Sequence, residues 1–187
     1  MLPNVLEVAR RLIQERVEAG AVVVDATMGN GHDTLFLARL VGERGKVIAY
    51  DIQPQALEQT RQRLIQENVL ERATLLLASH EEIDRISEPV SAIMFNLGYL
   101  PGGNKAITTQ AASTRKAIAA GLRVLKPGGI MTIVVYWGHA AGVPEKAEVE
   151  AYCAELPQRD YLVLKYQYLN QRNQAPFLLA IEKRVSS

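Results

Sequence analysis

The strongest constraint on the fold of this chain is a regular alternation of buried-strand and helical patterns along the sequence. Ala21–Asp25, for example, is a continuous apolar run that closes on an acid, as expected for a strand covered on both faces. In Asn4–Glu18, apolar residues recur at three- and four-residue spacing, which predicts a helix. By such patterns we expect strands at residues 21–25, 46–51, 73–77, 90–96 and 130–136, and helices at residues 4–18, 33–40, 54–68, 108–124 and 144–156.

The order of these elements predicts an α/β fold. Because strands and helices alternate, we expect a mostly parallel, doubly wound sheet with helices on both faces. Residues 161–168 and 176–183 alternate more strongly and predict a terminal antiparallel hairpin, which brings the sheet to seven strands, and Lys126–Gly129 predicts a turn. Right-handed crossovers place the strand-to-helix loops at the carboxyl edge of the sheet, where ligands bind in such folds.

Length and composition narrow the class of protein further. The 187 residues, 48% hydrophobic and 22% charged, fit one globular domain over residues 1–187. A net charge of +1 excludes a protein that coats nucleic acid by charge alone, although it allows a local basic patch. The longest apolar runs are too short to span a bilayer and no signal peptide is recognisable, so we expect a cytoplasmic protein. One cysteine, Cys153, and three scattered histidines predict no disulfide and no metal site, and Cys153 is expected to pack in the core.

The loop after the first expected strand has the features of a nucleotide site. Gly29 and Gly31 allow close approach of the backbone to a ligand. A dinucleotide fingerprint needs a third glycine where Thr34 stands. Asp25 and Asp33 flank the loop with no Lys or Arg between them, so a pyrophosphate would be repelled. S-adenosylmethionine fits better, because it lacks phosphate and carries a sulfonium and an ammonium group.

Residues after the second and third expected strands extend this site. Asp51 can accept hydrogen bonds from both hydroxyls of a ribose, and Ile52 can cover one face of an adenine. Ser79 and His80 are expected near the edge of the adenine. The alternative is that the acidic residues only cap helices and the glycines only turn the chain. Each signal is weak alone, but their combination in the expected strand-loop-helix order favours an S-adenosylmethionine site.

The loop after the fourth expected strand, Phe95–Lys105, is the candidate acceptor site. Asn96 offers one acceptor and two donors, and Tyr99 offers an aromatic face and a hydroxyl. Such a set can hold a planar base and orient an amine toward a methyl group. The alternative is a glycine-rich turn that packs on itself, but polar and aromatic loops at the carboxyl edge of a sheet are commonly functional.

Four blocks in order resemble one family. They are Asp25–Thr34 (DATMGNGHDT), Phe95–Gly103 (FNLGYLPGG), Tyr136–Gly142 (YWGHAAG) and Asn170–Pro176 (NQRNQAP). They look like the signature of the small bacterial class I methyltransferases labelled "putative rRNA methylase". Characterised members of that family methylate the 5-aminomethyl group of the tRNA wobble uridine, which gives 5-methylaminomethyl-2-thiouridine. The match covers nearly the whole chain, but Asn104 stands where the family pattern has an acid, and Ala175 stands where it has a proline.

The resemblance implies a Rossmann-like class I methyltransferase fold, with S-adenosylmethionine as cofactor and S-adenosylhomocysteine as its product. It also implies the anticodon stem-loop of tRNA as partner, no membrane or metal, and a homodimer. The residues it implies at the cofactor are Asp25, Met28, Gly29, Asn30, Gly31, Asp33, Asp51, Ile52, Gln53, Ser79, His80 and Asn96. The expected substrate contacts are Tyr99, Gly102, Lys105, Arg115, Asn170 and Arg172, and the expected catalytic residues are Asn96, Tyr99 and His139.

Two other functions remain open at this point. A methyltransferase with the same cofactor site can act on ribosomal RNA or on a small-molecule amine, and Asn96–Tyr99 is distantly like the Asn-Pro-Pro-Tyr motif of adenine amine methyltransferases. A nucleotide-binding module or an oxidoreductase is the alternative from a different class.

Overall fold

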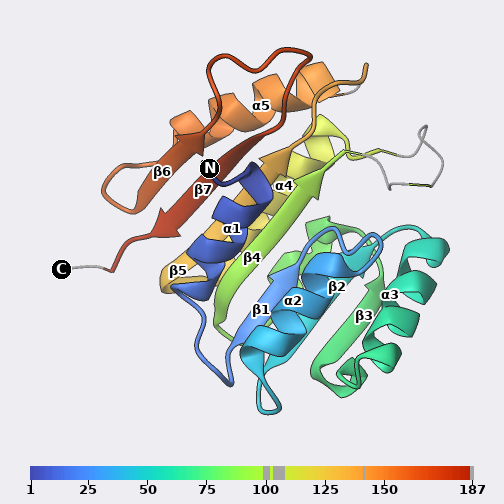
Figure 1. Ribbon diagram of the computed structural model, residues 1–187. Helices are drawn as coiled ribbons and strands as arrows, with labels where there is room; N and C mark the ends of the chain where they lie inside the picture. Colours follow the sequence, from blue (N-terminus) through green and yellow to red (C-terminus); the bar gives the residue numbers. More distant parts are fainter. Residues whose placement is uncertain (99–101, 103–107, 141, 186–187) are drawn as a thin grey trace.

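The computed structural model describes residues 1–98, 102, 108–140 and 142–185, and its strands form one mixed sheet (Figure 1). Within these residues the strand order is β3-β2-β1-β4-β5-β7-β6. Strands β1 to β5 pair in parallel, and β7 pairs antiparallel with β5 and with β6. The strands are β1 (Val22–Asp25), β2 (Lys46–Asp51), β3 (Ala73–Leu77), β4 (Val90–Leu97), β5 (Leu125–Val135), β6 (Tyr161–Tyr166) and β7 (Phe177–Lys183). The predicted α/β fold with a terminal hairpin is confirmed.

Helices cover both faces of this sheet (Figure 1). On one face, Ile13, Leu37 and Leu64 of the first three helices pack with Val23 of β1. On the other face, α4 and α5 pack against a second cluster that contains Val24. Neighbouring strand residues point to opposite faces, which explains why β1 is apolar throughout until its last residue. The helices are α1 (Val5–Gln14), α2 (His32–Val41), α3 (Pro54–Gln66), α4 (Ala111–Val124) and α5 (Gly142–Ala154), with 3-10 helices η1 (Leu70–Arg72) and η2 (His80–Arg85).

Several boundaries differ from the sequence prediction. Helix α1 ends at Gln14 and α4 begins at Ala111, so both are shorter than expected. Strand β5 begins at Leu125, so the predicted turn Lys126–Gly129 lies within its bounds. There the register against β4 jumps from Val90↔Leu125 to Ala92↔Ile130, which leaves the turn residues as an irregularity in the strand. The two 3-10 helices were not predicted, because segments this short carry no hydrophobic period.

The sheet topology determines where a ligand can bind. From β1 the chain adds β2 and β3 on one side, and β4 and β5 then continue on the other side. The order of the strands therefore reverses between β1 and β4, and such a switch opens a crevice at the carboxyl edge. The loops after β1 and β4 flank this crevice, and the end of β2 lies beside it.

Other expectations concern the core, metals and membranes. Cys153 is buried with the residues that α5 packs against the sheet, as predicted, and burial raises the pKa of its thiol to about 12. Among the described residues, no cluster of three or more His, Cys, Asp and Glu side chains could hold a metal ion. The helices in the same part of the chain include none with the length and apolar character to cross a membrane.

Candidate active site

A cavity of about 720 Å³ opens at the carboxyl edge of the sheet, at the predicted crevice. Its walls come from the loops after β1, β2, β3 and β4, together with α1 and the start of α4. All but two of the predicted cofactor residues line it: Met28, Gly29, Asn30, Asp33, Asp51, Ile52, Gln53, Ser79, His80 and Asn96. The structure therefore brings most of the predicted cofactor residues together at this cavity.

The glycines of the first loop have different roles. Gly29 has a φ of 50°, lines the cavity and donates its N–H to Asp51 Oδ2 at 3.0 Å. Gly31 does not line the cavity. It has a φ of 78°, and a Cβ there would lie 2.8 Å from Thr60 Oγ1 and 2.9 Å from Thr60 Cα. Gly31 is therefore required for close packing of the loop on α3, whereas Gly29 faces the ligand space.

Asp51 is held at the cavity wall by the backbone around it. Its Oδ2 accepts from Gly29, and its Oδ1 accepts from the Gln53 N–H at 3.0 Å. Each carboxylate oxygen can accept more than one hydrogen bond, so capacity for two ribose hydroxyls remains. Ile52 lies next to it and is 60% exposed, so its apolar side chain can cover an adenine.

Asp25, which the sequence predicts at the cofactor, does not line the cavity. Its carboxyl is fully buried and absent from the cavity lining. It accepts from Thr34 Oγ1 at 2.6 Å and from the Thr27 N–H at 3.2 Å. Burial, reinforced by the nearby charge of Asp33, raises the pKa of Asp25 to about 7. Asp25 therefore supports the loop from behind the cavity wall.

Asp33 lines the cavity, and it has a cationic partner that the sequence argument missed. Arg10 of α1 donates to Asp33 Oδ1 from Nε at 3.0 Å and from Nη2 at 2.7 Å. The sequence has no Lys or Arg between Asp25 and Asp33, but α1 supplies an arginine to the loop from outside it. Since Arg10 offsets one acid and Asp25 is turned away, charge alone discriminates less against a diphosphate than the sequence indicated.

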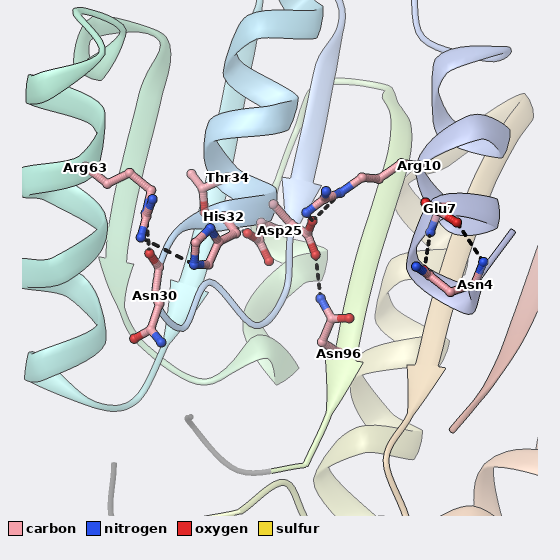
Figure 2. A network of polar contacts seen from close by, with 10 residues as sticks. Asn4, Glu7, Arg10, Asp25, Asn30, His32, Thr34, Arg63 and Asn96 are labelled. Carbon is pink, nitrogen blue, oxygen red and sulfur yellow. Dashed lines mark hydrogen bonds and ion pairs between the residues drawn. The ribbon is translucent and has the colours of Figure 1, made fainter. Parts of the chain in front are cut away.

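Asn96 is fixed at two points at the end of β4. Its backbone N–H donates to Thr27 Oγ1 at 2.8 Å, and its Nδ2 donates to Asp33 Oδ2 at 2.7 Å. Asn96 Oδ1 is buried and has no hydrogen-bond partner within the described part of the chain. Figure 2 shows Asn96 close to the end of β1, where Asp25 lies, on the side where Arg10 reaches in from α1. The amide of Asn96 is therefore held in one orientation, with Nδ2 on Asp33 and with Oδ1 as an acceptor that has no described partner.

Ser79 and His80 begin η2 beside the cavity. Ser79 caps this helix by accepting from the Glu81 N–H at 3.2 Å. His80 Nδ1 lies 3.3 Å from the carbonyl oxygen of Ala26, which requires Nδ1 to be the donor and leaves Nε2 as an acceptor. Burial lowers the pKa of His80, so the ring is neutral at pH 7. A neutral ring with a free acceptor suits the amino edge of an adenine.

The other described residues that the sequence predicts at the substrate or in catalysis do not line this cavity. His139 does not line the cavity, and its Nε2 lies 2.9 Å from the Tyr136 carbonyl oxygen, where it can only donate. Arg115 pairs with Glu148, and Asn170 and Arg172 are exposed between β6 and β7. Gly102 lines a second, smaller cavity beside α3. Tyr99 and Lys105 lie outside the described residues.

The cavity is also lined by residues to which the sequence analysis assigned no role. They are Leu6, Arg10, Thr27, Leu97, Gly98, Thr108, Thr109, Gln110, Ser113 and Tyr136, together with the alanines beside the strand ends. Tyr136 had a usable signal, since an aromatic residue directly follows the end of β5. Leu6 and Arg10 had none, because they belong to a helix outside the strand-to-loop pattern.

The donor set of the cavity fits S-adenosylmethionine. Asp51 is available to a ribose, Ile52 and His80 suit an adenine, and Asp33 provides a carboxylate for an ammonium group. No Lys side chain lines the described part of this wall, and its one Arg is already paired with Asp33. This arrangement provides for a zwitterionic nucleoside and supplies little to hold a diphosphate.

Comparison with known proteins agrees with this geometry. A tRNA (mnm(5)s(2)U34)-methyltransferase from Arabidopsis thaliana, described as chloroplastic, is 41% identical over 95% of this chain and 69% of its own length. A crystal structure described as a putative rRNA-methylase from Clostridium thermocellum is 41% identical, covers 98% of this chain and 99% of its own, and has a TM-score of 0.97. A putative methyltransferase from Streptococcus mutans in complex with SAH is 41% identical over 98% of this chain and 99% of its own, with a TM-score of 0.91.

The family assignment rests on the greater part of the sequence. Residues 47–182 match the family described as "Putative rRNA methylase". This range includes Asp51 and Asn96, which lie on opposite sides of the cavity opening between β2 and β4. The glycine loop precedes the matched range and is aligned by the relatives that cover nearly the whole chain. The chain belongs to this family of methyltransferases, with the class I fold that its resemblance predicted.

Proposed function

We propose that this protein is an S-adenosylmethionine-dependent N-methyltransferase. Its proposed reaction converts the 5-aminomethyl group of the wobble (2-thio)uridine of tRNA to 5-methylaminomethyl. The observation that carries the proposal is Asn96 Oδ1, a buried acceptor without a described partner at the wall of the cofactor cavity. The relative named for this tRNA modification, 41% identical over 95% of the chain, supports the choice of substrate.

Methyl transfer requires this chain mainly to position the acceptor amine against the methyl group and to exclude water. When bound, S-adenosylmethionine supplies an electrophilic methyl group on a sulfonium sulfur. Asn96 Oδ1 accepts an N–H of the neutral acceptor amine and so holds its nitrogen lone pair toward the methyl group. The nitrogen forms a bond to the methyl carbon as the carbon–sulfur bond breaks, and the ammonium product releases its extra proton to water. Positioning of this kind can supply roughly 7 kcal/mol or more of the barrier.

No general base is part of this proposal. Methylation of a neutral amine needs no prior removal of a proton, so the site must only select the neutral form. The sequence analysis expected His139 to contribute, but its Nε2 faces the Tyr136 carbonyl and it does not line the cavity. We therefore leave His139 out of the catalytic set, and Tyr99 stays a prediction.

We infer that RNA reaches the cavity from the loops at the carboxyl edge. The loop between β6 and β7, with exposed Asn170 and Arg172, contacts the loop after β5, since Trp137 Nε1 donates to the Ala175 carbonyl at 2.9 Å. Gly102, Lys105 and Arg115 remain predicted contacts. The anticodon stem-loop is the proposed partner.

Two further expectations remain proposals. A homodimer is supported by exposed Leu162, Val163 and Leu164 on β6, the last strand in the sheet order. A mass from small-angle scattering tests it, and a monomeric mass at micromolar concentration would contradict it. The cytoplasmic location stays a prediction, because the Arabidopsis relative is described as chloroplastic.

Nucleoside analysis tests the substrate. Wobble uridine from a strain that lacks this protein is expected to accumulate the 5-aminomethyl form, which the purified protein and S-adenosylmethionine convert to 5-methylaminomethyl. Mass spectrometry of tRNA and rRNA digests measures both products. Unchanged wobble uridine together with new methylation of rRNA would reject the tRNA proposal and favour the ribosomal alternative.

The cofactor is tested separately by calorimetry. S-adenosylhomocysteine is expected to bind far more tightly than NAD. Asp51→Ala is expected to weaken its binding by about 1–3 kcal/mol, because a charged hydrogen-bond partner is lost. Asp84→Ala, which removes only an exposed ion pair with Arg123, is the control. Unchanged affinity in Asp51→Ala would remove Asp51 from the cofactor site.

A further inference from the structure

A chain of charged contacts connects the N-terminal helix to the proposed acceptor site. Arg10 donates twice to Asp33 Oδ1, at 3.0 and 2.7 Å, and Asp33 Oδ2 accepts from Asn96 Nδ2 at 2.7 Å. The three residues come from α1, the first turn of α2 and the end of β4. All three line the cavity. Figure 2 shows that Arg10 and Asn96 come from separate elements.

This chain determines which way the Asn96 amide faces. A carboxylate only accepts hydrogen bonds, so the Asn96 atom that meets Asp33 must be the NH₂ group. The carbonyl oxygen is then turned away from Asp33, where no described residue binds it. If the amide flipped, its NH₂ would replace the acceptor and confront the N–H groups of a substrate amine. Asp33 therefore selects the amide orientation that methyl transfer requires.

Arg10 in turn determines the position and charge balance of Asp33. Asp33 is 8% exposed and lies close to the fully buried Asp25, so two acids share a poorly solvated region. The Arg10 guanidinium supplies the cation facing them and fixes Asp33 Oδ1 with two donors. Arg10 is itself placed by its helix: Asn4 and Glu7 form a capping box, and the guanidinium lies 5.5 Å from the Phe36 ring centroid.

We propose that Arg10 is a positioning residue for methyl transfer, acting through Asp33 to hold the Asn96 carbonyl oxygen toward the acceptor amine. This inference rests on the proposed N-methyltransferase function. It adds α1 to the catalytic machinery, although this helix lies outside the family match at residues 47–182 and outside every strand-to-helix loop.

The test compares Arg10→Ala with Arg16→Ala. Arg16 is a matched control, because it also pairs with an acid, Glu182, at 2.9 Å, and its side chain is 34% exposed against 39% for Arg10. Arg16→Ala removes a pair whose two partners are partly exposed and which contributes little stability, whereas Arg10→Ala leaves Asp33, 9% exposed in its side chain, without its cation, so circular dichroism and thermal unfolding of both variants verify the fold first. Arg10→Ala is expected to lower kcat roughly 10- to 100-fold with a smaller change in the KM for S-adenosylmethionine, and Arg10→Lys to recover part of the loss.

A double-mutant cycle shows whether Arg10 acts through Asp33. If it does, adding Arg10→Ala to Asp33→Asn lowers kcat little further than Asp33→Asn alone. If the two residues act independently, the two fold-losses in kcat multiply. Arg10→Ala with unchanged kcat, or with a raised KM for S-adenosylmethionine and no loss of kcat, would overturn the proposal. The second result would make Arg10 a cofactor ligand.

A spectroscopic readout separates this inference from the proposed substrate. The side-chain amide resonances of Asn96, assigned by their loss in Asn96→Asp, are expected to shift in Arg10→Ala and to stay in place in Arg16→Ala. Unmoved resonances would refute the contact chain, whatever the substrate is. Wild-type protein that fails to methylate 5-aminomethyluridine tRNA, while the resonances shift as expected, would refute the proposed function alone.

Discussion

At the scale of single residues, the raised pKa of Asp25 makes the free energy of unfolding depend on pH. A carboxyl whose pKa is raised to about 7 in the folded protein, from about 3.9 when exposed, binds more protons folded than unfolded. Its contribution to the free energy of unfolding is therefore complete below pH 4 and is lost as the pH rises toward 7. Relative to Asp25→Asn, the wild type is expected to lose roughly 1.4 kcal/mol per pH unit in that window. Urea unfolding of both proteins from pH 4.5 to 8 measures the difference, and parallel pH curves would contradict it.

Gly31 provides a second test at this scale. Gly31→Ala introduces a strained positive φ and a Cβ 2.9 Å from Thr60 Cα, which is backbone and cannot rotate away. Gly128 is the control, because its φ is +77° and the nearest atom to its Cβ position is Val185 Cγ2 at 3.7 Å, an ordinary contact distance. Gly128→Ala is expected to cost about 1 kcal/mol of unfolding free energy from strain alone, and Gly31→Ala at least about 1–3 kcal/mol more from overpacking. Equal losses in chemical denaturation would show that packing on Thr60 is unimportant.

At the scale of elements, Glu145 joins α5 to α4 and to the end of β4. This fully buried carboxylate accepts from Thr109 Oγ1 at 2.7 Å and from Thr114 Oγ1 at 2.6 Å. Thr109 also accepts from the Gly98 N–H at 3.0 Å and donates its own N–H to the Gly98 carbonyl at 2.9 Å. Glu145→Ala leaves two hydroxyls without their acceptor, so we expect a loss of about 2–4 kcal/mol of unfolding free energy, and less in Glu145→Gln. Denaturation measures the loss, and S-adenosylhomocysteine affinity is expected to be retained at a temperature where the variant is folded.

The order of the elements was predictable, whereas contacts between distant elements were not. Hydrophobic periodicity is local, so it located the strands and placed Asp51 and Asn96 at one edge of the sheet. The direction of the Asp25 side chain depends on its neighbours: Asp25 is still paired with Ala49 and Met94 inside the sheet, and Thr34 covers it. The pairing of Arg10 with Asp33 spans 23 residues, and the polar face of a helix has the same pattern whether it meets solvent or a cavity.

At the scale of the whole molecule, charge balance constrains how RNA can bind. The chain has 21 basic and 20 acidic residues, and many exposed cations are paired, as in Arg115–Glu148 and Arg39–Glu67. Contact with a phosphate must then break such a pair, so few net counterions are released. We expect the affinity for a labelled anticodon stem-loop to fall with salt at a log–log slope shallower than about −4.

Two arginines locate this RNA contact. Arg115 lies in the early part of α4, whose start borders the cavity, whereas Arg39 lies in the last turn of α2, away from the carboxyl edge. Their side chains are 57% and 59% exposed, and each pairs with a glutamate. Arg115→Ala is expected to weaken binding and to reduce the salt slope by less than the roughly 0.7–0.9 of an unpaired phosphate contact, because the Glu148 pair must be broken first, and Arg39→Ala to change neither. Fluorescence anisotropy between 50 and 200 mM salt makes the comparison. Equal slopes in the two variants would place the RNA away from α4. A slope near −10 for the unchanged protein would contradict the expected shallow slope and would mean that many unpaired cations contact phosphates.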